Sequence, residues 1–147
     1  MSGGIAVIGV LLVASAFGVW RQRTDGRVRA VAPSADAAGE SSAAASPFAA
    51  FGEMGEHATI VQFSAPVCAP CRAAKVIAGE VASQVPGVRH LEIDAESNME
   101  LVKEFGIMRT PTILVLDGQG RLSARISGVP RRDELLIALD DRRFEDI

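Results

Sequence analysis

The chain has 147 residues, of which 48% are hydrophobic and 5% aromatic, a length that suits one modest domain with room for an extra segment. Its formal net charge of -3 argues against a nucleic-acid partner, because nucleic-acid binding requires a basic face. Two cysteines cannot build the disulfide framework of a small secreted domain, and their close spacing means that their chemistry is local.

The N-terminal segment is strongly apolar. Residues 3–20, GGIAVIGVLLVASAFGVW, contain no charged side chain. At about 1.5 Å per residue, a helix of this length just crosses a hydrocarbon core roughly 30 Å thick. Its apolar character on all sides, with Trp20 at its end, favours a transmembrane helix over a buried one. We therefore predict that residues 1–20 anchor the chain in a membrane.

The charges around this segment predict its orientation. No Lys or Arg precedes it, whereas four arginines follow it, Arg21, Arg23, Arg27 and Arg29. Because positive clusters tend to remain cytoplasmic, we expect a single-pass cell-membrane protein whose bulk faces the cytoplasm, with the extracytoplasmic face as the alternative. The Ala-Ser-Ala run at 14–16 resembles a signal-peptide cleavage site, but the charged region that must precede a signal peptide's apolar core is missing.

Residues 21–46 combine this basic stretch with a run rich in Ala, Ser, Gly and Asp that shows no apolar period. We interpret them as a basic juxtamembrane stretch followed by a flexible linker. Two alternatives remain open, a frayed helix in the alanine-rich part and a short strand at RVRAV, residues 27–31. The folded domain is then expected over residues 47–147.

The first half of this domain predicts two helices and two strands. PFAAFGEMGEH (47–57) suits a short helix, and TIVQFS (59–64) and VRHLEID (88–94) have the composition of strands. Between the strands, RAAKVIAGEVASQV (72–85) repeats apolar residues at helical spacing, so a helix is expected to open at the two cysteines. The repeating residues are Ala74, Ile77, Ala78, Val81 and Val85.

The second half predicts a helix, a hairpin and a covering helix. The Ser-x-x-Glu pattern at 97–100 indicates a capping box before a short helix, which Gly106 is placed to end. TILVL (112–116), the turn DGQG and RLSARIS (121–127) predict a hairpin, and RRDELLIALDDRR (131–143) suits an amphipathic helix. The order implies an α/β fold with a mixed central sheet and helices on both faces.

The chemistry is expected at the motif Cys68-Ala69-Pro70-Cys71. Cys68 follows a predicted strand and opens a predicted helix, whose unpaired backbone N–H groups and positive dipole end stabilise a thiolate. Cys71 lies one turn further on, close enough to attack a mixed disulfide on Cys68. We therefore expect Cys68 to be the nucleophile and Cys71 the resolving thiol.

The cysteine pair has two other interpretations, a zinc site and a pair of inert thiols. A zinc site needs further ligands, and His57 and His90, the two histidines of the chain, do not follow the H-x3-5-H spacing of such sites. A pair of inert buried thiols fits poorly with a position between a strand and a helix. No metal is therefore expected.

Two segments downstream of the cysteines complete a recognisable pattern. Thr110-Pro111-Thr112 precedes an apolar strand, and Gly128 follows the next strand. Together with C-A-P-C, these positions make residues 47–147 resemble the thioredoxin family, which usually has C-G-P-C. The resemblance implies a thioredoxin fold in which Pro111 is cis and Thr110 and Gly128 contact a bound polypeptide. The alternative for Pro111 is a trans proline that opens an edge strand.

The chain also departs from the family at three positions. Val67 stands where thioredoxins have Trp before the first cysteine, so substrate contacts are expected to differ. Gln62 aligns with the family's buried acid, and a neutral amide forms hydrogen bonds but cannot take a proton from Cys71. His90 aligns with the partner lysine of that acid, and we interpret it as a solvent-facing strand residue, with a substitute base for Cys71 as the alternative.

The resulting hypothesis is a membrane-anchored bacterial thioredoxin-like protein, a thiol-disulfide oxidoreductase that reduces protein disulfides through its dithiol. The resemblance implies a thioredoxin reductase or another electron donor, and no metal or organic cofactor. The alternative function is a non-catalytic thioredoxin-fold module that docks a membrane partner.

Overall fold

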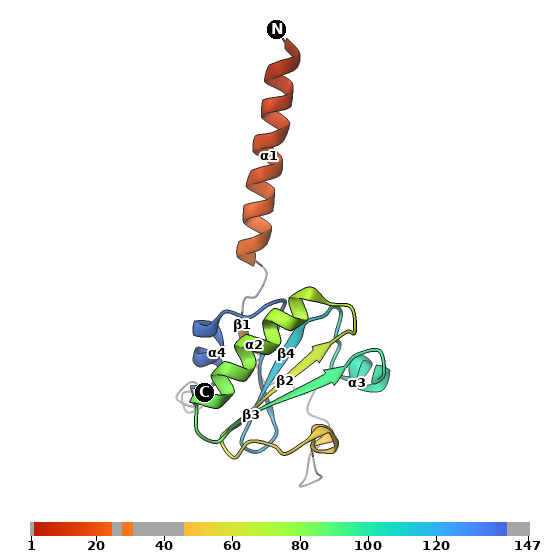
Figure 1. The fold of residues 1–147 in the computed structure, drawn as a ribbon, viewed down its shortest axis with the longest axis vertical. Helices are drawn as coiled ribbons and strands as arrows, with labels where there is room; N and C mark the ends of the chain where they lie inside the picture. Colours follow the sequence, from red (N-terminus) through yellow and green to blue (C-terminus); the bar gives the residue numbers. More distant parts are fainter. Residues whose placement is uncertain (1, 25–27, 31–45, 141–147) are drawn as a thin grey trace.

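The computed structural model describes residues 2–24, 28–30 and 46–140. Five strands, four α-helices and one short 3-10 helix lie within these ranges (Figure 1). In chain order they are α1 (Ser2–Thr24), β1 (Val28–Ala30), η1 (Pro47–Phe51), β2 (Ala58–Ser64), α2 (Ala69–Gln84), β3 (Val88–Asp94), α3 (Met99–Glu104), β4 (Thr112–Asp117), β5 (Leu122–Ser127) and α4 (Arg132–Ala138).

The strands form one mixed sheet in the order β1-β5-β4-β2-β3. β2 pairs with β3 in parallel and with β4 antiparallel, and β5 pairs antiparallel with both β4 and β1. A parallel pair needs a crossover connection, and α2 supplies it between β2 and β3. All seven residues of β2 are buried, as expected for a strand in the interior of a sheet with both faces covered.

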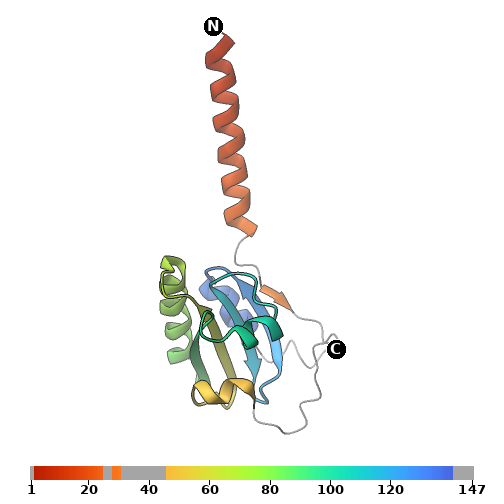
Figure 2. The same ribbon diagram turned by 90° about the vertical axis from the view of Figure 1, so that its right-hand side faces the viewer.

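Helices cover both faces of the sheet, as predicted (Figure 2). On one face, α2 and α4 pack against alternate strand residues such as Ile60 and Ile113. On the other face, η1 and α3 cover a second core, in which Phe48 contacts the rings of Phe63 and Phe105 at centroid distances of 6.3 and 4.8 Å. Successive strand side chains point to opposite faces, so each strand contributes to both cores.

The capping-box prediction at 97–100 is wrong. Asn98 is the N-cap of α3 and its side chain forms no capping hydrogen bond. The Ser97 hydroxyl instead donates to the carboxylate of Asp94, which also accepts the Glu96 N–H at 3.0 Å. The Ser97 side chain bonds to Asp94 instead of capping α3, because a charged acceptor forms stronger hydrogen bonds than a neutral one. The predicted helix end is confirmed, with Gly106 at a φ of +58° directly after α3.

The N-terminal region differs in part from the prediction. A helix, α1, forms over the apolar segment, and Figures 1 and 2 show it standing clear of the sheet. Within the described ranges, no helix combines the length and apolar content that a bilayer crossing requires, so the transmembrane helix predicted for residues 1–20 is not found. Val28–Ala30 forms β1, which is the strand alternative left open for the linker. Residues 31–45 lie outside the described ranges.

Candidate active site

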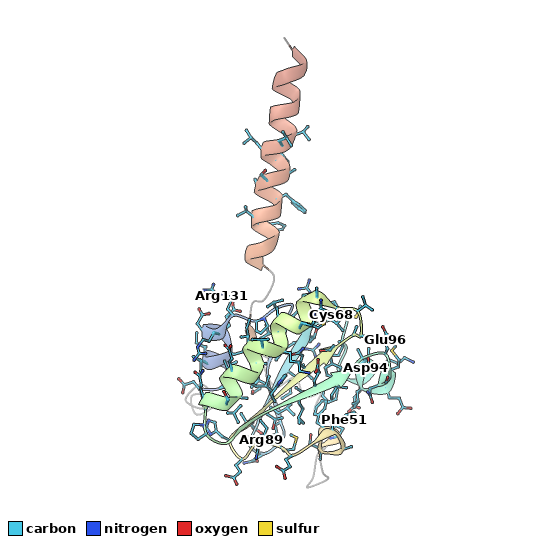
Figure 3. The ribbon with its side chains drawn as sticks, viewed as in Figure 1. Phe51, Cys68, Arg89, Asp94, Glu96 and Arg131 are labelled. Atoms are coloured by element: carbon cyan, nitrogen blue, oxygen red, sulfur yellow. A yellow bond between two sulfur atoms is a disulfide. The ribbon has the colours of Figure 1, made fainter. Side chains whose placement is uncertain are left out.

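Cys68 lies where the chain leaves β2 and enters α2 (Figure 3). It is the N-cap residue of α2, with an extended backbone, and its Sγ accepts the backbone N–H of Cys71 at 3.2 Å. Pro70 fits the first turn of this helix because the N–H that proline lacks would have no partner there. The reactive sulfur is therefore held at the positive end of the helix, as predicted.

The two cysteines form an intramolecular disulfide in this structure. Their sulfurs are 1.97 Å apart and their Cα atoms 5.2 Å apart. Cys68 is 9% exposed and Cys71 3%, so Cys68 is the more accessible to a substrate. Ala69 is exposed beside them, and Val67 is 98% exposed. Among the described residues, no cluster of three or more His, Cys, Asp or Glu side chains is arranged to hold a metal.

The proline segment lies beside the cysteine loop. The Thr110–Pro111 peptide bond is cis, which confirms the prediction for Pro111. Thr112, the next residue, pairs with Phe63 near the end of β2, so this segment adjoins the strand that leads to Cys68. Ala65 and Thr110 line a shared hollow of about 250 Å³, whose apolar walls include Met99, Val102, Ile107 and Met108.

Gly128 completes this surface. Its N–H donates to the carbonyl oxygen of Pro111 at 2.8 Å, with a φ of +95° that favours glycine. Arg109, which sequence reasoning missed, donates from its guanidinium to the carbonyl of Ser127 at 3.2 Å. Thr112 Oγ1 donates to the Arg109 carbonyl at 2.7 Å. These bonds fix the cis-proline segment against the loop after β5.

A polar network runs from the buried Gln62 and Ser64, under the start of α2, to the exposed pair Lys75 and Glu92. The Gln62 amide nitrogen donates to Ser64 Oγ at 2.8 Å and to the carbonyl oxygen of Cys71 at 3.0 Å. Ser64 Oγ donates to Glu92 at 2.9 Å, and Glu92 accepts an ion-paired hydrogen bond from Lys75 at 2.6 Å. Gln62 is fully buried, and its Oε1 has no hydrogen-bond partner.

The charges of this network follow from its contacts. The hydrogen bond from Lys75 lowers the pKa of Glu92 from its ordinary 4.5, with a further contribution from Ser64, while burial opposes the shift. Burial lowers the pKa of His90 from 6.5, while Glu92 opposes the shift and Lys75 adds to it. His90 is half-buried, with Nε2 inaccessible and without a partner, so its interpretation as a solvent-facing residue is wrong. Glu92 is therefore ionised at neutral pH and is a weak base.

Sequence reasoning missed Ser64 and Glu92, and left Lys75 open between a source of positive potential near the cysteines and a solvated surface charge. The alternation of residues along β2 and β3 is the signal that could have found Ser64 and Glu92. Gln62 and Ser64 share the face of β2 that α2 covers, and the register places Glu92 directly opposite Gln62 on β3. A polar residue at such alternating positions under a helix predicts a hydrogen-bonded partner, because buried polar groups are rarely left alone.

A cysteine at a helix N-terminus, a more buried cysteine one turn on and disulfide-bonded to it, and a nearby cis proline define a thiol-disulfide oxidoreductase. The sequence model of the family described as Thioredoxin matches residues 42–141. The chain belongs to the thioredoxin family.

Individual relatives agree with this assignment. The chain is 35% identical over 81 residues to a thioredoxin of Methanocaldococcus jannaschii, which covers 54% of this chain and 89% of the relative. It is 27% identical over 73 residues to thioredoxin 1 of a Nostoc species, covering 49% and 68%. Among solved structures, Fasciola hepatica thioredoxin is similar with a TM-score of 0.51, at 24% identity, covering 58% of this chain and 80% of that one. The structural likeness supports the fold.

Proposed function

We propose that this oxidoreductase works as a reductase of protein disulfides through the C-A-P-C dithiol. The observation that carries the proposal is the hydrogen bond from the Cys71 N–H to Cys68 Sγ at the N-terminus of α2. In the reduced protein, the same donor and the helix dipole favour a Cys68 thiolate, the nucleophilic form of the residue. Cys71 is the more buried of the two thiols, so it remains available to attack the mixed disulfide that forms on Cys68.

The reaction has two exchange steps. The Cys68 thiolate attacks one sulfur of a substrate disulfide, forms a mixed disulfide and releases the first substrate sulfur as a thiolate, which takes up a proton. Cys71 then loses its proton and attacks Cys68 Sγ, which releases the second substrate sulfur and closes the Cys68–Cys71 disulfide. The substrate gains two electrons and two protons, and the dithiol is oxidised. A thioredoxin reductase or another electron donor restores it.

The substrate is proposed to be an extended polypeptide segment. The surface next to the cysteine loop offers the backbone of Thr110, the loop at Gly128 and the hollow that Ala65 and Thr110 line. A strand-like segment can hydrogen-bond to the Thr110 backbone while its disulfide meets the exposed edge of Cys68. Because Val67 and Met108 are 98% and 93% exposed, apolar side chains next to the substrate disulfide are favoured.

The test is the reduction potential of the full chain, measured by equilibration with glutathione buffers and mass analysis of trapped thiols. A value near about -270 mV supports a reductase, and one near about -120 mV indicates an oxidant. The Cys68→Ser variant is the control, since it cannot form the disulfide. A docking module predicts that this variant retains the cellular role of the protein, whereas an oxidoreductase predicts its loss.

We also propose that the N-terminal segment tethers the domain to the cell membrane with the domain on the cytoplasmic side. The uncharged run of residues 3–20 and the four arginines that follow it support this proposal. The large apolar side chains of Leu11, Leu12, Phe17 and Trp20 on α1 are exposed. Fractionation of cells that express the full chain, compared with a chain lacking residues 1–20, tests the tether. Protease protection of the domain in intact spheroplasts would indicate the cytoplasmic side, and digestion the outer side.

A further inference from the structure

Gln62 is placed beside the resolving cysteine with its amide orientation fixed. Glu92 is ionised and accepts hydrogen bonds only, so the Ser64 hydroxyl must donate its hydrogen to Glu92. Ser64 Oγ can then only accept from its other neighbour, which requires the amide nitrogen of Gln62 on that side. The Cys71 carbonyl, also an acceptor, requires the same nitrogen. Both N–H groups of the amide are thereby used.

This arrangement leaves Gln62 Oε1 buried and without a donor. A buried carbonyl oxygen is costly when it lacks a hydrogen bond. The oxidised cysteine pair offers it none, because neither sulfur of a disulfide carries a hydrogen. On reduction, the 3%-exposed Cys71 gains an S–H group, a weak hydrogen-bond donor that is also buried. The Gln62 side chain already reaches Cys71, because its amide nitrogen donates to the backbone carbonyl of Cys71 at 3.0 Å.

We propose that Gln62 Oε1 accepts the S–H hydrogen of Cys71 in the reduced protein, so that Gln62 is a positioning residue that stabilises the dithiol. The inference rests on the proposed function of the cysteine pair. Lys75, Glu92 and Ser64 act through Gln62 by holding the amide in one orientation. Where the family has a buried acid that transfers a proton, this chain has a neutral side chain that accepts a hydrogen bond. The hydrogen bond forms only when Cys71 is reduced.

The redox equilibrium isolates this hydrogen bond. In the exchange, the Cys68–Cys71 disulfide and two glutathione thiols give the dithiol and one glutathione disulfide, so electrons and protons balance. Hydrogen bonds of Gln62 to Ser64 and to the Cys71 carbonyl are available in both redox states and cancel. Removing Oε1 should therefore shift the equilibrium toward the disulfide by roughly 2- to 10-fold, the range expected for one neutral hydrogen bond.

The variants are Gln62→Met, which keeps the side-chain length without the amide, and Gln62→Asn, which keeps a buried amide but withdraws it by one methylene. Full-length wild type and both variants are equilibrated with glutathione buffers. We expect both variants to be more reducing than wild type. Thr59→Val is the matched control, because it removes a buried hydrogen bond at the other end of β2, where Thr59 Oγ1 accepts the Gly55 N–H at 2.9 Å. It should leave the equilibrium constant equal to that of wild type within the error of the measurement.

A second measurement observes the bond itself. In a Cys68→Ala background Cys71 is the single thiol of the chain, and its S–H stretching band reports its hydrogen bonding in the infrared. We expect the band to move to higher frequency when Gln62→Met is added. An unchanged band, or a glutathione equilibrium equal to that of wild type in both Gln62 variants, would overturn the inference. If wild type itself forms no Cys68–Cys71 disulfide in any buffer, the proposed function fails instead.

Discussion

Replacement of His90 by Gln should make the protein less sensitive to mild acid. His90 lies half-buried on the face of β3 that α2 covers, with Glu92 and Lys75 as its charged neighbours. Burial lowers the pKa of His90 from 6.5 in the folded protein, so the unfolded chain binds a proton more readily in this pH range. Stability therefore falls as the pH drops below about 6.5, until the folded-state pKa is reached.

The size of the effect follows from proton linkage. Between pH 7.5 and 5.5, an unfolded histidine with a pKa of 6.5 gains about 1.4 kcal/mol of protonation free energy, the largest loss that His90 can cause over this interval. Glu92 affects the stability of the fold in a different pH range. Its pKa is lowered from 4.5, so its stabilisation is present above that pH and is lost as the pH falls through the folded-state value.

The assay is urea unfolding of wild type and the His90→Gln variant at pH 7.5, 6.5 and 5.5. We expect the free energy of unfolding of the variant to fall less, by up to about 1.4 kcal/mol over the interval. Glu92→Gln is the matched second variant: it removes the charge that opposes the lowering of the His90 pKa, so it should increase the stability lost between pH 7.5 and 5.5. If wild type and His90→Gln lost the same stability within about 0.3 kcal/mol, the assignment of the pH dependence to buried His90 would be refuted.

Three further predictions concern the core, one backbone contact and the reaction. Phe48→Ala should lower the free energy of unfolding by about 3–5 kcal/mol, because it empties a 1%-exposed site between two rings, and a loss below about 1 kcal/mol in urea would contradict this. Gly55→Ala should destabilise strongly in thermal unfolding, since its Cβ would lie 2.0 Å from the Ala58 carbonyl oxygen, and an unchanged midpoint would argue against that close approach. Cys71→Ser should accumulate a mixed disulfide at Cys68, visible by non-reducing mass analysis, and rapid turnover by this variant would exclude the resolving role.

The elements with strong local signals were predictable from the sequence. β3 coincides with the predicted residues 88–94, and β2 and the β4–β5 hairpin differ from the prediction by at most a residue at their ends. The predicted helix at 131–143 is shorter, with α4 covering Arg132–Ala138 and residues 141–143 lying outside the described ranges. β1 was open only as an alternative, because a three-residue strand owes its existence to pairing with β5, almost a hundred residues away.

The candidate site also contains residues that local motifs predict and residues that only the strand register reveals. Cys68, Cys71 and cis-Pro111 follow from motifs that are short and ordered along the chain. The hydrogen bond between Ser64 and Glu92 spans 28 residues, and it becomes visible only when the register of β2 against β3 is known. Gln62 was recognised as an unusual neighbour of Cys71, but its orientation depends on that distant carboxylate.

The pairing of β1 with β5 also limits the distance between α1 and the active site. Three residues separate Thr24, the last residue of α1, from Val28, so these ends are at most about 14 Å apart. Val28 pairs with Ile126, two residues before Gly128, and therefore enters the sheet at the end of the strands where the proline segment lies. Under the proposed membrane tether, this short connection would keep the active site of the domain near the membrane surface, and substrates at that surface would be favoured over distant ones.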